Sequence, residues 1–187
     1  MTKKNLNIFR NIPTLKTDRL VLRKIKMEDL SDVHEYASDP IVPRYLLWYP
    51  HKTLSFTKAY LKYLQKLYSK GKFYDWGIEF NGKMVGTVGF TSFDFKSNSA
   101  EIGYVLGREY WGQGIATEAV REILKFAFET LDLSLICAMF LPENVQSRRV
   151  LEKCNFNYSE KKSFLVKEEY RDVEIYSLSK EAFYCNI

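Results

Sequence analysis

The chain has few of the residues from which metal sites and disulfide frameworks are built. It contains 187 residues but only three cysteines, none with C-x-x-C spacing, and two histidines. An odd number of unpatterned thiols favours free cysteines in a reducing cytosol, where we expect the protein. His34 and His51 have no partners at metal-ligand spacing, so no metal is expected. No apolar run approaches the roughly 20 residues of a membrane span, and the first residues lack the apolar core of a secretory signal.

Charge of one sign is not concentrated anywhere in the chain. Lysine and arginine number 28 and aspartate and glutamate 23, which leaves a net charge of +5. A mild positive charge suits an anionic ligand, whereas the lack of a long basic run argues against direct binding of nucleic acid. The length and the apolar share of 46% predict a single domain over residues 1–187. Residues 1–16 form an arm that the pattern leaves either ordered or flexible.

Hydrophobic periodicity predicts alternating strands and helices. The expected strands are residues 19–23, 73–80, 84–90, 100–106, 134–141, 158–166 and 171–178, and the expected helices are residues 27–38, 53–69, 117–131 and 145–154. Asn81-Gly82 is a type I′ turn signal and predicts a hairpin. The apolar run 134–141 is typical of a strand buried on both faces, parallel to strand 100–106 through one crossover. The pattern therefore predicts a mixed α/β sheet with a parallel pair.

Two stretches outside these elements are candidates for a ligand site. Residues 41–52, IVPRYLLWYPHK, are expected to be a packed aromatic loop that either walls a substrate cleft or covers the core. Gly112 and Gly114 lie in the turn between strand 100–106 and the helix after it. Free N–H groups at a helix start favour a phosphate there, although a tight turn without a ligand fits two glycines equally well.

Four segments resemble the GNAT superfamily of acetyl-coenzyme A-dependent N-acetyltransferases, and within it the RimJ/RimL branch of ribosomal-protein N-terminal acetyltransferases. They are TDRLVLRKIKMEDLSDVHEYASDP, AEIGYVL, YWGQGIATEA and PENVQSRRVLEKCNF, and the resemblance covers residues 15–178. It implies a mostly antiparallel sheet of six to seven strands with one central, splayed parallel pair and about four helices. Asn155 stands where the branch has glycine, and asparagine tolerates the positive φ expected there. The tyrosine that many members use as a general acid has no clear match.

The resemblance also implies acetyl-coenzyme A as co-substrate and assigns residues to its parts. The pyrophosphate is expected on the loop Trp111, Gly112, Gln113, Gly114, Ile115, Ala116 and Thr117. The pantetheine arm is expected along the backbone of Tyr104, Val105 and Leu106, with Asn144 and Ser147 nearby. A backbone N–H there would also bind the developing oxyanion. Asn144 and Ser147 can equally be a plain helix cap.

Glu101 and Ser147 are the candidate catalytic residues. The resemblance favours Glu101 as a general base acting directly or through water, against a solvated strand carboxylate. It places Ser147 near the sulfur, where a hydroxyl would donate a hydrogen bond to the departing thiolate. We expect direct transfer to an amine in a ternary complex, most simply to a peptide N-terminal α-amine.

Other functions stay open at this point. A small amine such as a polyamine, an aminoglycoside-like amine or an amino acid is the alternative acceptor. A non-catalytic acyl-coenzyme A-binding module is the alternative of another class. The sequence leaves the protein a monomer or a homodimer.

Overall fold

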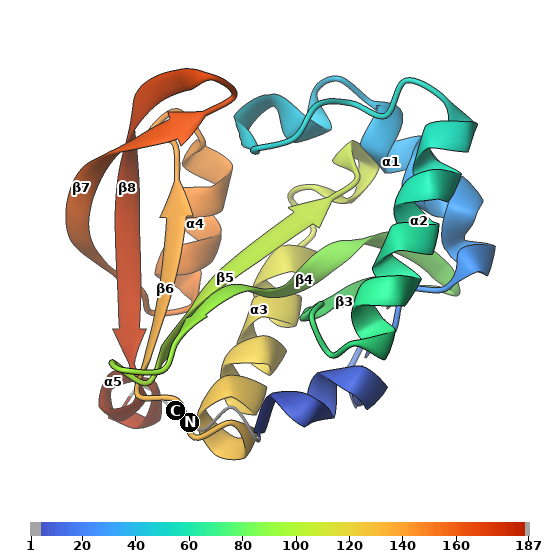
Figure 1. Ribbon diagram of the computed structural model, residues 1–187. Helices are drawn as coiled ribbons and strands as arrows, with labels where there is room; N and C mark the ends of the chain where they lie inside the picture. The colour runs from blue at the N-terminus through green and yellow to red at the C-terminus, as the bar shows by residue number, and fades with distance from the viewer. Residues whose placement is uncertain (1–4, 186–187) are drawn as a thin grey trace.

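An eight-stranded mixed sheet forms the centre of the molecule, as Figure 1 shows. The computed structural model describes residues 5–185. The strand order is β1-β2-β3-β4-β5-β6-β8-β7, and every neighbouring pair is antiparallel except β5 and β6. The strands are β1 (Leu15–Lys16), β2 (Leu20–Arg23), β3 (Asp75–Phe80), β4 (Lys83–Asp94), β5 (Ser99–Leu106), β6 (Leu135–Phe140), β7 (Asn157–Val166) and β8 (Glu169–Ser179).

Helices lie on both faces of the sheet (Figure 1). We call the face that carries α1 and α2 the front face, and the one that carries α3 and α4 the back face. The helices are α1 (Leu30–Ser38), α2 (Leu54–Ser69), α3 (Ile115–Lys125), α4 (Val145–Lys153) and α5 (Lys180–Cys185), with 3-10 turns at Asn5–Asn11, Met27–Asp29, Val42–Tyr45 and Arg108–Tyr110 and a π turn at Phe126–Thr130. Within residues 5–185, no helix has the length and apolar character needed to cross a membrane.

The observed architecture is the predicted mixed sheet with one parallel pair, and it differs in detail. Eight strands replace the expected six to seven because the arm adds β1, which pairs with β2. The short α5 brings the helices to five rather than about four. The predicted helix 27–38 begins as a 3-10 turn before α1. The predicted helix 117–131 starts earlier, at Ile115, and leaves α-geometry after Lys125.

Turn and cap signals in the sequence are confirmed. Asn81 and Gly82 have φ values of 52° and 78°, as a type I′ hairpin requires. Asn155 has φ of 64° after α4. Asn144 caps α4, because its side chain accepts a hydrogen bond from the Ser147 N–H at 3.2 Å. These features are local, so the sequence alone specifies them.

The N-terminal arm packs into the core from residue 8 onward. Phe9 is fully buried, and its ring meets those of Trp76 and Phe126 edge to face. The Trp76 indole N–H donates to the Pro13 carbonyl at 2.7 Å. The arm therefore closes the back face beside α3 instead of hanging free.

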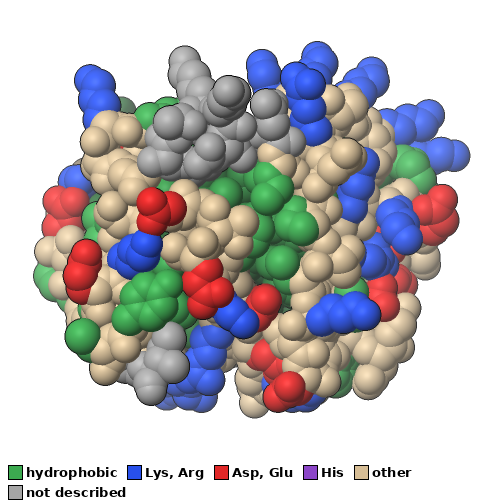
Figure 2. Space-filling view, turned by 90° about the horizontal axis from the view of Figure 1, so that it is seen from below, with side chains coloured by type: hydrophobic (Ala, Val, Ile, Leu, Met, Phe, Trp, Pro, Cys, Tyr) green, Lys and Arg blue, Asp and Glu red, His purple; other side chains and the backbone are tan. Residues whose placement is uncertain are grey.

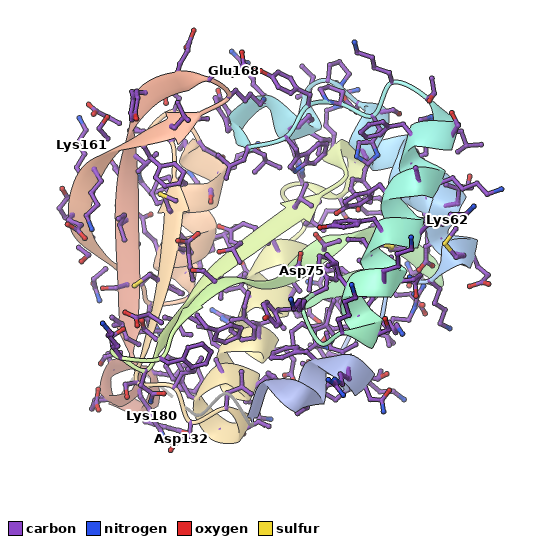
Figure 3. The ribbon with its side chains drawn as sticks, in the orientation of Figure 1. Lys62, Asp75, Asp132, Lys161, Glu168 and Lys180 are labelled. Carbon is purple, nitrogen blue, oxygen red and sulfur yellow. The ribbon has the colours of Figure 1, made fainter. Side chains whose placement is uncertain are left out.

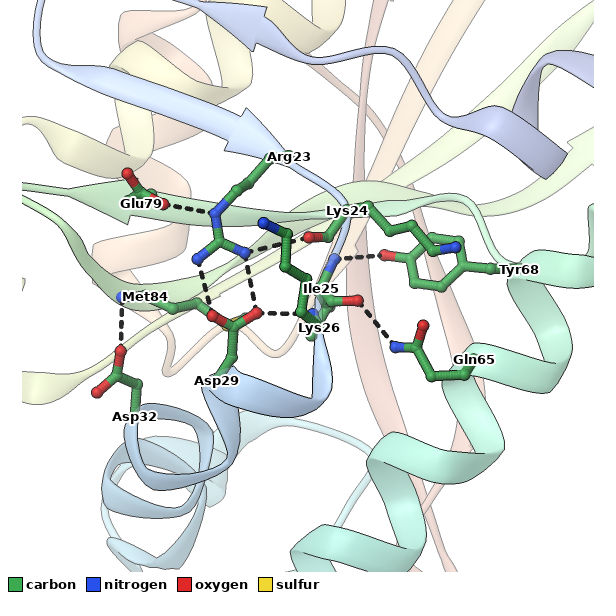
Figure 4. Close-up of polar contacts among 10 residues, drawn as sticks. All are labelled: Arg23, Lys24, Ile25, Lys26, Asp29, Asp32, Gln65, Tyr68, Glu79 and Met84. Atoms are coloured by element: carbon green, nitrogen blue, oxygen red, sulfur yellow. Dashed lines mark hydrogen bonds and ion pairs between the residues drawn. The ribbon is translucent and has the colours of Figure 1, made fainter.

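A charged cluster fixes the start of α1 against β2 and β3 (Figure 4). The Arg23 guanidinium makes two hydrogen bonds to Asp29, at 2.8 and 2.9 Å, and a third to Glu79. Burial alone would raise the pKa of Asp29, but hydrogen bonds from Arg23 and the Lys26 N–H hold this pKa below its ordinary value. Asp32 accepts from the Met84 N–H at 2.9 Å. The cluster thus anchors α1 over the front face.

The strand β6 corrects the expectation of burial on both faces. Ile136, Ala138 and Phe140 are buried on the back face, whereas the alternate residues Cys137 and Met139 are partly exposed. Figure 1 shows the reason, since α1 and α2 lie over β3 and β4 and do not reach β6. The front face is thus open next to the parallel pair.

Surface charge is mixed on the side of the molecule seen from below. Figure 2 shows basic and acidic side chains interspersed around a hydrophobic area. Along the upper right of this view, basic side chains predominate.

Candidate active site

The parallel strands β5 and β6 part halfway along their length, which opens a gap in the sheet. They pair from Ser99 with Leu135 up to Ile102 with Ala138. Beyond that point β5 pairs only with β4, through Gly103–Leu106, and β6 only with β8. The predicted pantetheine-binding residues Tyr104, Val105 and Leu106 all lie on the edge of β5 that has no strand partner. Such an edge can form strand-like hydrogen bonds with the amide groups of an extended ligand.

The glycine turn follows directly from that edge and presents the start of α3. Gly112 and Gly114 have φ values of 74° and 78°, a left-handed conformation that favours glycine. Gly114 is the N-cap of α3, and no side chain caps it. The first N–H groups of α3 are therefore available to an anion. The Trp111 indole N–H donates to the Leu106 carbonyl at 2.9 Å and so ties the turn to β5.

The other residues predicted for the phosphate loop divide between core and surface. The side chains of Ile115 and Thr117 are buried, Ala116 is partly buried, and Gln113 is exposed. The amide of Gln113 donates to the Glu109 carbonyl at 2.7 Å. The Ile115 side chain thus anchors this loop to the core, while Gln113 remains at the surface.

A clamp that sequence reasoning missed holds this loop from the first strand. The Arg19 guanidinium forms an ion pair with Glu118 at 2.6 Å and donates to the Gln113 carbonyl at 3.1 Å. The Thr17 hydroxyl donates to Glu118 at 2.5 Å. Burial would raise the pKa of Glu118, but the bonds from Thr17 and Arg19 keep this pKa below its ordinary value. About a hundred residues separate the partners, so only the TDRL segment of the resemblance hints at the contact.

Tyr104 and Ser147 meet across the gap on the back face. Their hydroxyl oxygens are 2.7 Å apart, and the Tyr104 hydroxyl also lies 3.0 Å from the Ser147 carbonyl. Burial raises the pKa of the Tyr104 phenol well above its ordinary value, so the phenol stays protonated. Sequence reasoning assigned only the backbone of Tyr104, and the structure adds its hydroxyl beside the candidate leaving-group residue.

Glu101 lies on the opposite face from Tyr104, because residues three apart in a strand point to opposite sides. It is partly exposed on the front face. The Thr91 hydroxyl donates to its carboxylate at 2.8 Å. Thr91 stands at the bulge of β4, where the register with β5 shifts. The two candidate catalytic residues therefore flank the gap from opposite faces of the sheet.

Several polar side chains around the site are paired with other residues. Arg148 pairs with Glu174 at 2.9 Å, and Arg108 pairs with Asp39 at 3.2 Å. His51 is buried, with its Nδ1 3.0 Å from the Thr57 hydroxyl. Over residues 5–185, no group of three or more His, Cys, Asp or Glu side chains could hold a metal ion.

Comparisons with known proteins agree with this geometry. Residues 19–157 match the model of the acetyltransferase (GNAT) domain. An uncharacterized N-acetyltransferase, p20 of Bacillus licheniformis, is 34% identical over 91% of this chain and 98% of its own. A GNAT-family acetyltransferase structure from Bacillus anthracis has a TM-score of 0.80 at 28% identity and covers 90% of this chain and 99% of its own.

One further solved structure shares the fold and was crystallised with coenzyme A. It is RimL, the ribosomal L7/L12 alpha-N-protein acetyltransferase, with a TM-score of 0.77 at 19% identity over 91% of this chain and 99% of its own. The domain match and the p20 relative each cover most of the chain. This chain therefore belongs to the GNAT family and is an N-acetyltransferase that takes its acetyl group from acetyl-coenzyme A.

Proposed function

We propose that the enzyme acetylates the N-terminal α-amine of a protein or peptide by direct attack, with both substrates bound at once. The observation that carries this proposal is the placement of Glu101 and Ser147 on opposite faces of the gap between β5 and β6. The amine approaches from the open front face, and the thiolate leaves towards the back face. The RimL relative, named for α-N-acetylation of a ribosomal protein, supports the choice of an α-amine.

An α-amine acceptor requires little base catalysis from Glu101. A free α-amino group has a pKa of about 8, so roughly a tenth is neutral at pH 7, whereas less than a thousandth of a lysine side chain is neutral. Glu101 is partly exposed and its carboxylate accepts a hydrogen bond from Thr91. It suffices to take the proton that the nitrogen releases on attack, directly or through a water.

The unpaired edge of β5 and the hydroxyl pair serve the thioester. Backbone N–H groups on the unpaired edge of β5 bind the carbonyl oxygen as it becomes an oxyanion. Ser147 donates a hydrogen bond to the departing thiolate, and Tyr104 donates to Ser147 in turn. The turn at Gly112 and Gly114, with the start of α3, binds the pyrophosphate.

A covalent acetyl-enzyme is not part of this scheme. Cys137 is the free thiol on the front face next to Glu101. Burial, and then the charges of Glu101 and Glu160, raise the pKa of the Cys137 thiol above its ordinary value. A thiol that keeps its proton at neutral pH is a poor nucleophile.

The test is release of coenzyme A thiol with a panel of peptides and small amines. Peptides are expected to be accepted at the α-amine, located by mass spectrometry. Glu101→Gln should lower kcat by about 10²-fold or more. Ser147→Ala should lower kcat by about 10- to 100-fold with little change in the KM for acetyl-coenzyme A. Glu129→Gln, at an exposed glutamate of the π turn, is the matched control and should behave as wild type.

Other outcomes separate the alternatives. Thiol release with small amines alone would replace the peptide acceptor by a small-molecule one. Tight binding of acetyl-coenzyme A without thiol release for any amine would indicate an acyl-coenzyme A-binding module. An acetylated cysteine on the reaction path would refute direct attack.

A further inference from the structure

Asp75 stands at the end of a row of residues that runs across the front face to the gap. It lies opposite Gly89 of β4, which lies opposite Gly103 of β5. A Cβ built on Gly89 would be 2.4 Å from the Asp75 Oδ1, so the carboxylate lies directly over the Gly89 backbone. Figure 3 shows Asp75 beside α2, over the strands. We call Asp75, Gly89 and Gly103 the glycine row.

The Asp75 carboxylate has no partner within residues 5–185. No hydrogen bond or ion pair reaches it, whereas Asp29 and Asp32 on the same side of the sheet each accept from donors. Over the same residues, Arg148 Nε is the one fully enclosed polar side-chain atom without a partner. The Asp75 oxygens are thus reached by solvent, and the side chain is partly exposed. The carboxylate is therefore largely enclosed by the protein, with part of its surface open to solvent.

Three tyrosines from α1 and α2 lie close enough to Asp75 for its charge to raise their pKa values. Tyr68 donates its hydroxyl to the backbone carbonyl of Asp75, at 2.7 Å, and not to the carboxylate. Burial, with the charge of Asp75 as a smaller cause, raises the pKa of Tyr60 to about 12 and that of Tyr36 further. Burial likewise raises the pKa of Asp75 to about 7. These phenols provide an apolar, neutral surrounding in which a positive charge would be the missing partner.

The distance along the glycine row limits what can occupy it. Two strand spacings separate Asp75 from Gly103, which is about 10 Å between Cα atoms. Glu101 lies on the same face two residues before Gly103. Gly89 and Gly103 carry no side chains, and the methyl group of Thr91 lies over Gly103, 2.9 Å from where a Cβ of that residue would be. A ligand with its reacting nitrogen at the gap would therefore cross the Thr91 side chain to reach Asp75.

We propose that Asp75 binds a second cationic group of the acceptor, so that the enzyme selects amines with another ammonium or guanidinium about one extended side chain away. This inference rests on the proposed function and names the substrate class of the same site. A peptide that begins with lysine or arginine has this chemistry, and so does a free diamine. Asp75 acts in recognition and takes no part in the attack on the thioester.

The test compares acceptors that differ only in the second charge. Peptides that begin with lysine are paired with peptides of otherwise identical sequence that begin with norleucine, and 1,4-diaminobutane is paired with butylamine. Wild type should prefer the cationic member by about 10- to 100-fold in kcat/KM, mainly through KM. Asp75→Asn should reduce that preference to about threefold or less, because kcat/KM should fall more for the cationic acceptors than for the neutral ones. The peptide and diamine arms distinguish the two sources of the cation.

Three variants control the measurement. Asp132→Asn removes the same charge from an exposed residue at the far end of the molecule (Figure 3), where φ is 54° and asparagine is tolerated. It should keep the wild-type preference. Asp75→Glu should retain part of it. Asp75→Ser provides a second neutral variant if Asp75→Asn does not fold.

The outcomes distinguish this inference from the function on which it rests. A wild-type enzyme that acetylates neutral and cationic acceptors equally well would overturn the role of Asp75 and leave the transferase function intact. The same holds if Asp75→Asn keeps the preference, or loses activity on all acceptors to the same extent. Failure of every amine to release thiol would instead contradict the proposed function itself.

Discussion

Replacing Asp75 by asparagine should make the protein more stable at alkaline pH, although Asp75 lies in the proposed active site. Burial raises the pKa of this carboxyl from its ordinary 3.8 to about 7. The folded chain therefore keeps a proton that the unfolded chain releases between these two pH values. Below pH 4 both states are protonated and the carboxyl has no effect on stability. As the pH rises from 4 to 7, the free energy of unfolding falls progressively, and the loss is complete above pH 7.

The size of the effect follows from the pKa difference. Each pKa unit corresponds to about 1.4 kcal/mol, so a difference of roughly three units has an upper limit of about 4 kcal/mol. Asp75 is partly exposed, and solvent screening reduces the cost, so we expect about 2 kcal/mol. Asparagine has nearly the same shape and no charge. For a chain of this length, such a gain raises the Tm by about 4 to 8 °C.

Thermal unfolding followed by circular dichroism at several pH values measures this prediction. The Tm of Asp75→Asn should equal that of wild type near pH 4 and exceed it progressively up to pH 8. Asp132→Asn is the control with the opposite sign, since the bond to Lys180 lowers the pKa of Asp132. An Asp75→Asn protein that is less stable than wild type at pH 8 would mean that the carboxylate has a stabilising partner. The place for a cation of the acceptor would then not exist.

Three further variants test the framework around the site. Arg23→Met leaves Asp29 buried without its counter-charge and should lower the free energy of unfolding by about 3 kcal/mol in urea titrations at pH 7. Gly89→Ala would place its Cβ 2.3 Å from the Tyr74 carbonyl, so it should lower the Tm, and an unchanged Tm would contradict the close approach of β3 and β4. Glu118→Gln should raise the KM for acetyl-coenzyme A several-fold without changing the KM for the amine.

The parts of the fold that the sequence predicts well are those whose cause is local. Asn81-Gly82 needs only its own two φ values, and Asn155 and Asn144 end and begin α4 through their own backbone and side chain. The crossover from β5 through α3 to β6 also follows from neighbouring periodic segments. The turn at Gly112 and Gly114 belongs to this class, because its two left-handed residues are the glycines themselves.

What the sequence could not predict depends on residues far apart in the chain. Tyr104 and Ser147 are 43 residues apart, and their contact follows from how β5 and α4 pack. The exposure of Cys137 follows from the reach of α1 and α2, which the pattern of β6 alone cannot encode. An apolar run predicts a strand that is buried on both faces. The run itself does not indicate whether a helix covers each face.

The part of the site proposed for acetyl-coenzyme A is built mainly from neighbouring residues, whereas the part proposed for the acceptor is built from distant segments. This difference affects how specificity for the acceptor can change. The proposed acetyl-coenzyme A half lies on the back face and at the gap, on one continuous stretch from β5 to α3 that Arg19 clamps. The proposed acceptor half lies on the front face, on β3, β4, α1 and α2, which the cluster of Arg23 and Asp29 holds in place. We therefore expect a substitution at Asp75 on the front face to leave the glycine turn unchanged. Under this proposal, acceptor choice can change by substitution at Asp75 without loss of the acetyl donor.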